Sequence, residues 1–182
     1  RVVILGSVDG HSRWFSSRAL REGGVDAGYP DPQPGISFFE RDPLSNEPLG
    51  TGREKAGQHI QAAFVPGDKM AYERRFSDWL PRAAAAGLTG VFDAGAGAPT
   101  EQDAYAIWQA LGESGELTLR IFGSVREVDS ADVIASRFKA FSETYASDMV
   151  RPEAIKLAAD GVPEGHTAFL LTPYVDSTNE DF

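Results

Sequence analysis

The chain contains no cysteine among its 182 residues, which excludes disulfides, thiolate nucleophiles and cysteine metal sites. It has only three histidines, His11, His59 and His166, and none belongs to an H-x-H or H-E-x-x-H pair. The histidines alone therefore predict no zinc site. Positive charge is also scarce, because 17 basic residues stand against 27 acidic ones and give a net charge of -10. This balance disfavours nucleic acid and acidic membrane surfaces as partners.

Long apolar runs are missing as well. No stretch approaches the roughly 20 apolar residues that a transmembrane helix needs. The apolar start, residues 1–5, is too short for a secretory signal. We therefore expect no membrane partner and a cytoplasmic location. Because the first residue is Arg1 and not methionine, we expect a processed product or a segment of a longer protein.

The chain divides into two regions of different texture. Residues 1–65 are rich in glycine and proline and are expected to form an irregular α+β segment, with strands at 1–5 and 36–40 and a short helix ending near Leu20. Residues 66–182 show a regular alternation of apolar patterns. It predicts helices at 68–86, 100–113 and 130–145 and strands near 88–94, 117–125 and 154–159. Such an alternation favours an α/β fold with parallel strands joined by helices.

Ligands of parallel α/β folds gather at the carboxyl ends of the strands. The candidates at these ends are Asp93, Ser124 and Lys156. Asp93 either binds a ligand or metal, or caps a turn, and the turn is the commoner case. Lys156 lies in the apolar run Ala154–Ala159, where an unpaired ammonium is costly to bury. It is expected to form a salt bridge, to lie at the open end of the strand, or to be neutralised or covalently modified.

The segment from Asp9 to Trp14 follows a strand and contains a turn, an imidazole, a guanidinium and an indole ring. Such a loop often binds ligands, so His11 and Trp14 are candidate substrate-binding residues. The alternative is a turn in which His11 satisfies backbone groups and Trp14 covers the core. The chemistry favours neither. The turn at 95–100 indicates a helix entry and not a phosphate loop, and a serine triad is not supported because G-x-S-x-G is absent.

Four motifs in order resemble amidohydrolase family 3, in particular its N-substituted formamide deformylase branch. They are Asp9-Gly-His-Ser-Arg-Trp-Phe-Ser-Ser-Arg-Ala-Leu20; Asp42 with Glu47-Pro-Leu-Gly-Thr-Gly52 and Glu54; Ala86-Gly-Leu-Thr-Gly-Val-Phe-Asp93; and Ile155-Lys-Leu-Ala-Ala-Asp-Gly-Val162 with Thr167-Ala and Pro173-Tyr174. The resemblance covers nearly the whole chain. Two positions depart from the family pattern: Ser16 replaces a usual asparagine, and Asn46 a common glycine.

The resemblance implies a metal-dependent hydrolase on a (β/α)8, or TIM, barrel, of which this chain would span an inserted segment and about strands two to four. Family members hold zinc or another divalent metal with an H-x-H pair, later histidines, an aspartate and a lysine on strand four. Only the lysine is matched here, by Lys156, which in related enzymes is carboxylated and bridges two metal ions. The chain is thus expected to bind no metal by itself.

Three functions remain open at this point. The first is a fragment of a hydrolase that cleaves amide, non-peptide carbon–nitrogen bonds of a small molecule with metal-activated water, inactive alone. The second is a non-catalytic α/β binding or regulatory module without the metal ligands. The third is an unrelated doubly wound domain in which Asp93 and Lys156 face one crevice. A partial barrel would leave open sheet edges, which favours self-association.

Overall fold

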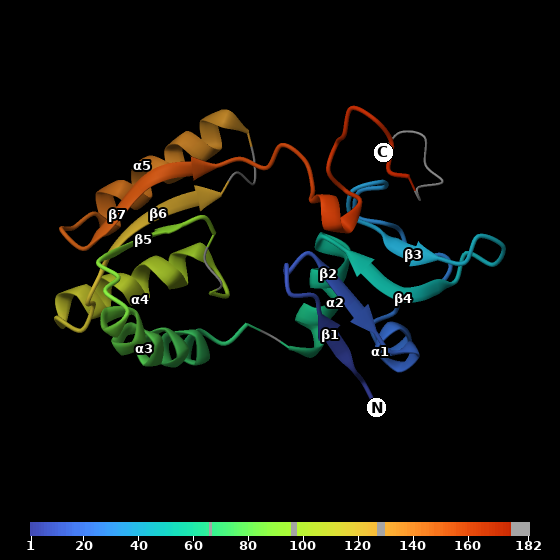
Figure 1. The fold of residues 1–182 in the computed structure, drawn as a ribbon, viewed down its shortest axis with the longest axis horizontal. Helices are drawn as coiled ribbons and strands as arrows, with labels where there is room; N and C mark the ends of the chain where they lie inside the picture. The colour runs from blue at the N-terminus through green and yellow to red at the C-terminus, as the bar shows by residue number, and fades with distance from the viewer. Residues whose placement is uncertain (66, 96–97, 127–129, 176–182) are drawn as a thin grey trace. The chain divides into compact units, whose positions relative to one another are not determined.

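The computed structural model describes residues 1–65, 67–95, 98–126 and 130–175, and these fall into two compact units. The first unit combines the described residues up to 65 with those from 159 onward, and the second unit spans 67–158. Figure 1 traces the chain through both units, with the N-terminal strands in blue and the last described residues in red. Within the described residues, no helix is both long enough and apolar enough to cross a membrane.

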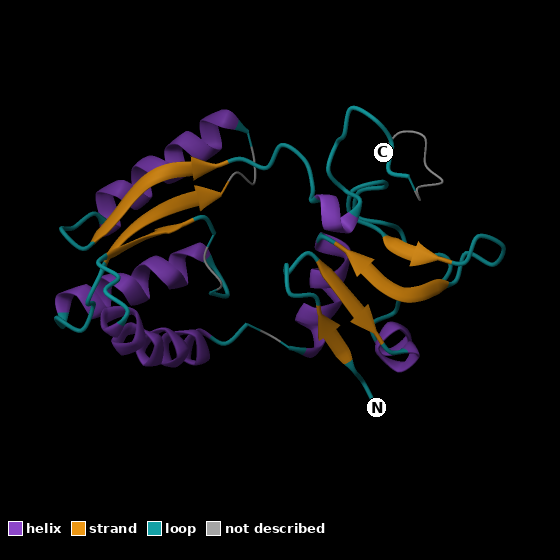
Figure 2. Ribbon diagram, in the orientation of Figure 1, coloured by secondary structure: helices purple, strands orange, loops and turns teal. Residues whose placement is uncertain are grey.

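The first unit is built on an antiparallel sheet with the strand order β1-β2-β4-β3. Its strands are β1 (Ile4–Gly6), β2 (Ser12–Phe15), β3 (Phe39–Arg41) and β4 (Pro48–Arg53). Two helices, α1 (Ser17–Glu22) and α2 (Lys55–Phe64), contact the inner strands β2 and β4 (Figure 2). The core of this unit therefore lies between the middle of the sheet and the two helices.

Glycines allow α2 to lie close to the sheet. A Cβ atom on Gly57 would lie 2.6 Å from Cγ of Arg13, and one on Gly52 would lie 3.0 Å from the backbone nitrogen of Gly57. Large apolar side chains then fill the remaining space, and Phe15, Phe39 and Ile60 are each at most 2% exposed. The two glycines therefore permit a close backbone approach, and apolar side chains of α2 such as Ala56 and Ile60 pack in the core.

The structure corrects the expected loop at 9–14. Ser12–Phe15 is strand β2, which pairs with β1 on one side and with β4 on the other. Helix α2 and strand β4 were not expected from the sequence either, which indicated only strands at 1–5 and 36–40 and one short helix in residues 1–65. These elements depend on pairing between residues far apart in the chain, which local periodicity does not reveal.

The second unit contains a parallel sheet with the order β5-β6-β7. The strands are β5 (Gly90–Asp93), β6 (Arg120–Arg126) and β7 (Val150–Lys156), and the helices are α3 (Lys69–Ala85), α4 (Glu101–Glu113) and α5 (Ala131–Tyr145). The expected alternation of parallel strands and helices is confirmed. The third strand begins at Val150, earlier than the expected residue 154, and it includes Pro152. Proline is tolerated there because β7 is an edge strand among the described residues.

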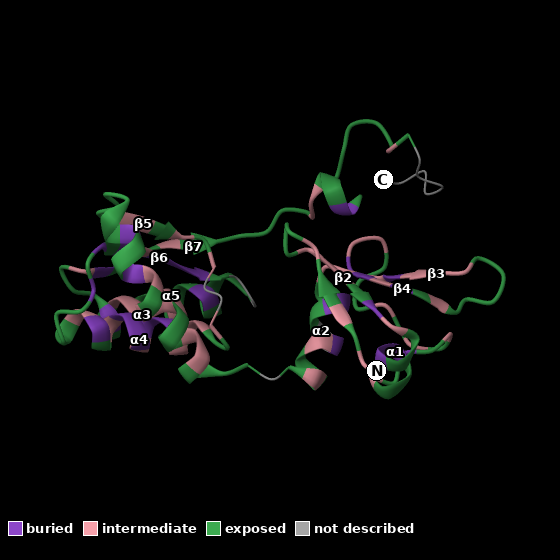
Figure 3. Ribbon diagram, turned by 60° about the horizontal axis from the view of Figure 1, so that its bottom comes forward, coloured by how far each residue is buried: buried purple, intermediate pink, exposed green. Residues whose placement is uncertain are grey.

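Polar caps and apolar faces explain the helices of this unit. The Asp68 carboxylate accepts a hydrogen bond from the Ala71 N–H at the start of α3, and the Thr100 hydroxyl accepts one from the Asp103 N–H at the start of α4, both at 3.0 Å. Tyr105 and Trp108 of α4 are almost fully buried, together with apolar residues of β6 and β7. In Figure 3 buried residues lie on both strands and helices of this unit.

Helices cover one face of the parallel sheet. Val91, Ile121 and Val150 lie side by side across the three strands, and the latter two are buried. The next row is Phe92, Phe122 and Arg151; because successive side chains point to opposite faces, this row lies on the other face. Phe92 is 62% exposed there. Parallel sheets are usually covered on both faces, so the second face of this sheet lacks its usual cover among the described residues.

Residues from 159 onward belong to the first unit, whereas the sequence placed them with the barrel-like region 66–182. They contain a short 3-10 turn, η1 (Pro163–Gly165), and backbone hydrogen bonds from Gly161 to Thr167 and from Thr167 to Val162 close the segment on itself. The side chain of Thr167 contacts Glu54 of the first unit. This long-range contact explains why the segment groups with residues 1–65. No closed barrel is present in the described residues.

Candidate functional site

Three candidate residues lie at the carboxyl end of the parallel sheet in the second unit. Asp93 is the last residue of β5, Ser124 lies near the end of β6, and Lys156 is the last residue of β7. The register pairs Asp93 with Gly123 and Arg126 with Lys156. The buried Ser124 hydroxyl donates to the backbone carbonyl of Asp93 at 2.8 Å, which ties the first two strand ends together.

Asp93 is half-buried, and this burial raises the pKa of its carboxyl group above the ordinary value. The Gly95 N–H, which donates to the carboxylate at 3.2 Å, and the positive charges of Arg126 and Lys156 oppose the increase, while Glu101 adds to it. A carboxyl group with a raised pKa at the end of a parallel strand can hold a proton or bind a cation, which makes Asp93 a functional candidate. The Gly95 hydrogen bond also fits the turn-capping interpretation.

An ion-paired network supports the end of β6. The Glu101 carboxylate, in the first turn of α4, accepts hydrogen bonds from the Arg126 N–H at 2.8 Å and from Arg137 Nη2 at 2.7 Å. Arg137 also donates to the Arg126 carbonyl at 3.2 Å. The network connects the strand end to helices α4 and α5. Sequence reasoning missed it, because it is formed by residues of three separate elements.

Tyr105 lies beneath this strand end. Its hydroxyl donates to the Ser124 carbonyl at 3.3 Å, and burial raises the pKa of the phenol. A Cβ atom on Gly123 would lie 2.1 Å from the Tyr105 hydroxyl oxygen, so only glycine fits at this point of β6. The ring packs between Trp108 and Phe141, with centroids 5.0 Å from each. Tyr105 therefore fixes the position of the site without having been a candidate.

Lys156 is the last residue of β7. It is exposed, and within the described residues it forms no ion pair. Ile155 and Leu157 beside it are also exposed, at 39% and 65%. The run lies where β7 leaves the sheet, so its apolar composition does not reflect burial. Of the alternatives for Lys156, the open end of the strand is the observed one.

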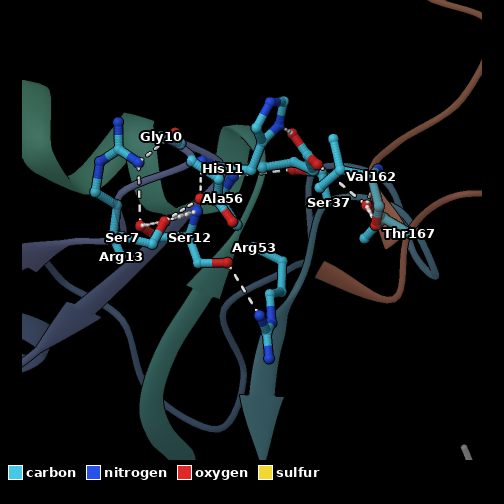
Figure 4. Close-up of polar contacts among 12 residues, drawn as sticks. Ser7, Gly10, His11, Ser12, Arg13, Ser37, Arg53, Ala56, Val162 and Thr167 are labelled. Atoms are coloured by element: carbon cyan, nitrogen blue, oxygen red, sulfur yellow. Dashed lines mark hydrogen bonds and ion pairs between the residues drawn. The ribbon is translucent and has the colours of Figure 1, made fainter. Parts of the chain in front are cut away.

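The first unit contains a second polar cluster. His11 Nδ1 lies 2.8 Å from Glu54 Oε2, and the Thr167 hydroxyl donates to Glu54 Oε1 at 3.1 Å (Figure 4). Thr167 is 1% exposed, whereas the His11 side chain is 41% exposed. Sequence reasoning did not single out Glu54 or Thr167 as functional, although both lie in the segments that carry the family resemblance.

Trp14 does not join this cluster through a hydrogen bond in the described structure. It lies opposite Thr51 in the β2–β4 pairing and is 45% exposed. Its indole ring lies over Gly50, where a Cβ atom would come within 3.1 Å of Nε1. Trp14 therefore covers the sheet only in part, and its substrate-binding role stays a prediction.

The predicted site residues thus form two sets. His11 and Trp14 lie in the first unit, and Asp93 and Lys156 in the second. In the described part of the chain, no three His, Cys, Asp or Glu side chains lie close enough together to hold a metal ion. The third alternative, a doubly wound domain, would need more strands in the parallel sheet. In the described residues no further strand pairs with β5 or β7.

The family is shown by one comparison with known proteins, and two similar proteins were also found. The sequence profile described as the amidohydrolase family matches residues 1–182. The exoenzymes regulatory protein AepA of Pectobacterium carotovorum subsp. carotovorum is 29% identical over 167 residues, which cover 90% of this chain and 35% of that protein. The crystal structure of an uncharacterized metal-dependent hydrolase from Pyrococcus horikoshii OT3 is also similar, with a TM-score of 0.56 and 14% sequence identity. The match covers 99% of this chain and 33% of the hydrolase chain. The chain spans about a third of the length of both proteins.

Proposed function

The chain belongs to the amidohydrolase family, and from this premise we propose that it forms part of a metal-dependent hydrolase. In this proposal β5, β6 and β7 are strands two to four of a (β/α)8 barrel, and the first unit is an inserted α+β segment. The parallel order of the strands and the helices between them support the assignment. The exposed Phe92 supports it too, because further barrel strands would cover that face of the sheet.

One observation carries the assignment of the site. Asp93, Ser124 and Lys156 come from three neighbouring parallel strands and lie at the same end of the sheet. Active sites of (β/α)8 barrels lie at this end, and catalytic residues come from the ends of several strands. The proposed substrate is a small molecule with a non-peptide amide bond, such as an N-substituted formamide, and the proposed reaction is hydrolysis of its carbon–nitrogen bond. The proposed location is cytoplasmic.

The described residues do not by themselves fit a metal ion. A protonated lysine is only a hydrogen-bond donor, so an unmodified Lys156 offers no ligand atom, and Asp93 has no second carboxylate or imidazole grouped with it among these residues. We propose that Lys156 is carboxylated in the whole protein and then contributes oxygen ligands to zinc or another divalent ion. The ion would supply an activated water. The remaining ligands would come from outside the residues described here.

The test is Lys156→Ala in a longer polypeptide that includes the proposed remaining strands. Metal content by elemental analysis and amide hydrolysis should both fall to background, because the residue proposed to hold the metal would be lost. The matched control is Lys139→Ala, which removes an exposed lysine of the same unit that pairs with Glu143 at 3.8 Å. It should change neither quantity. Normal metal content and turnover in Lys156→Ala would refute the assigned role.

The 182-residue chain alone gives a second test. We expect it to bind less than one equivalent of zinc and to hydrolyse no amide, since it lacks a grouped set of ligands in its described residues. Elemental analysis that finds about one or two tightly bound metal ions per chain would contradict this expectation. Such a result would require a ligand set formed within the chain or between copies of it.

A regulatory module is the second candidate function. It is favoured by the name of the Pectobacterium relative, which is a regulatory protein, and by the missing group of metal ligands in the described residues. The gene sequence separates the two proposals. An H-x-H strand encoded upstream supports the hydrolase, whereas an open reading frame that begins and ends with this chain supports a regulatory module.

A further inference from the structure

Glu54 uses both of its carboxylate oxygens within the first unit. Oε2 lies 2.8 Å from His11 Nδ1, and Oε1 accepts the Thr167 hydroxyl proton at 3.1 Å. The Glu54 side chain is 16% exposed, so water has little access to these bonds, whereas the His11 side chain is 41% exposed. The carboxylate is thus enclosed, and the imidazole that it holds reaches the surface.

The backbone of Glu54 is strained. Its φ is 48° and its ψ is -128°, a combination that a non-glycine residue rarely adopts. Such a conformation is energetically unfavourable and persists only where the surroundings hold it in place. Here the Glu54 N–H donates to the His11 carbonyl at 2.7 Å, so the same two residues are joined by a backbone bond as well as a side-chain bond. Strain of this kind often marks a functional position.

Thr167 holds Glu54 from the other side. Its hydroxyl oxygen accepts the Val162 N–H at 2.9 Å, and its single proton is then available for Glu54 Oε1. Gly161 allows this arrangement, because a Cβ atom there would lie 2.0 Å from the Thr167 hydroxyl oxygen. Figure 4 shows Val162 and Thr167 next to His11. Gly161 therefore leaves space for Thr167, Thr167 orients Glu54, and Glu54 in turn orients His11.

We propose that Glu54 is a positioning residue that fixes the tautomer of His11 and makes His11 Nε2 a hydrogen-bond acceptor for the substrate. An ionised carboxylate only accepts hydrogen bonds, so the His11 proton must be on Nδ1. In a neutral imidazole Nε2 is then unprotonated. The complementary ligand group is an N–H donor, and its assignment to a substrate amide rests on the proposed function.

A metal ion is the other ligand that such an imidazole suits, since metal-binding histidines commonly donate their second ring N–H to a carboxylate. Glu54 would orient the ring in the same way for a metal ion as for an N–H donor, so the other groups around His11 decide between the two ligands. In the described residues no group of three ligands surrounds His11. The contacts therefore favour an N–H donor over a metal ion.

The tautomer is measured by long-range 1H–15N correlation spectra of the 182-residue chain at about pH 8.5, where an ordinary imidazole is neutral. Loss of one signal set in His11→Gln assigns the His11 ring. We expect a protonated Nδ1 and an unprotonated Nε2 in the unmodified chain. A His11 ring that is protonated at Nε2 would overturn the proposal.

Glu54→Gly tests the cause of this tautomer. Glycine accepts the positive φ of this position, so the variant removes the carboxylate without adding backbone strain. We expect the Nδ1–H form of His11 to lose its dominance. The matched control is Asn46→Gly, at another positive-φ position of the same unit (φ 60°), which should leave the His11 spectrum unchanged. An unchanged tautomer in Glu54→Gly would show that Glu54 does not position the ring.

N-Methylformamide, a small secondary amide, then tests the acceptor role. It should shift the His11 Nε2 resonance in a saturable way in the unmodified chain and several-fold less in Glu54→Gly. A zinc titration is run beside it, and stoichiometric zinc binding at His11, or no response to the amide, refutes the proposed ligand. Because no turnover is measured, these results do not depend on the proposed hydrolase. An amide shift with no hydrolysis by the longer protein would reject the hydrolase and keep the binding role.

Discussion

The two units hold their candidate residues by different kinds of contact. In the second unit the strand register places Asp93 and Lys156, so their positions follow from backbone pairing. In the first unit His11 is held by side-chain bonds among residues distant in the sequence, and one of them, Thr167, lies 113 positions from Glu54. Damage to the second site therefore requires damage to the sheet, whereas the first site can be lost locally. The resistance of a site to local damage therefore depends on the kind of contact that holds its residues, and not on their position alone.

The largest effect is expected in the second unit. Gly123→Ala places a Cβ atom 2.1 Å from the Tyr105 hydroxyl oxygen, and Tyr105 is enclosed by other rings and cannot move aside. We expect a loss of roughly 3 kcal/mol in the free energy of unfolding, as for other overpacked cores. Urea denaturation followed by circular dichroism measures it.

The matched control for this variant is Gly112→Ala. A Cβ atom there meets nothing closer than 3.8 Å, and the residue lies within helix α4. Alanine should stabilise the helix by about 0.5–1 kcal/mol. If both variants behave alike, the close approach of Gly123 to Tyr105 does not support the sheet, and the contrast between the units is weakened.

A smaller, local effect is expected in the first unit. Gly161→Ala displaces Thr167, because the new Cβ atom would lie 2.0 Å from the Thr167 hydroxyl oxygen and 2.6 Å from its carbonyl oxygen. Hydrogen exchange should accelerate near residues 161–167 and 54, while β5, β6 and β7 keep their protection. The cost in global stability should be about 1–2 kcal/mol. Loss of protection in the second unit would show that the sites are not independently built.

The smallest effects concern two aspartates with opposite pKa shifts. Burial raises the pKa of Asp93 in the second unit, whereas the Ser45 and Leu44 N–H groups lower the pKa of the exposed Asp42 in the first. In the window between the ordinary value of 3.8 and the raised value, folded Asp93 binds more protons than unfolded Asp93. The ionised form therefore destabilises the fold at neutral pH. Asp42 has the reverse sign, since its stabilisation is present above 3.8 and is lost as the pH falls through the lowered pKa.

Asparagine variants test these signs. Asp93→Asn should raise the melting temperature at about pH 7. The difference in melting temperature from the unmodified chain should decrease as the pH falls below the raised pKa of Asp93. Asp42→Asn should lower the melting temperature slightly at about pH 7, with the loss disappearing in acid. Scanning calorimetry at several pH values measures both. Shifts of the same sign would contradict the difference in solvation between the two carboxyl groups.

The sequence predicted the second unit well because its elements are set by local patterns. Helix α4 lies within the predicted range 100–113, where Thr100 is its N-cap and Ala104, Ile107 and Trp108 are buried on one face. Asp93 also ends its strand as predicted. Here hydrophobic period and capping chemistry agree with the tertiary structure.

The first unit was less predictable because its elements depend on long-range pairing. Ser12–Phe15 is too short for a clear strand pattern and forms a strand by pairing with its neighbours β1 and β4. Glu54 and Thr167 form their bond across more than half of the chain, and no local signal marks it. The apolar run around Lys156 does not indicate burial either, because such a run is buried only where other residues cover it, and residues 155–157 are exposed.

The return of residues 159–175 to the first unit affects how the protein is made. During synthesis the partners of Glu54 cannot all be present until Thr167 has left the ribosome, after the whole second unit has been translated. Domains generally fold as units in the order of synthesis, at about 5–20 residues per second. The second unit can therefore fold while the strained Glu54 still lacks one of its supports. A translation pause between residues 158 and 167 would lengthen the interval in which the first unit is most open to chaperones and proteases.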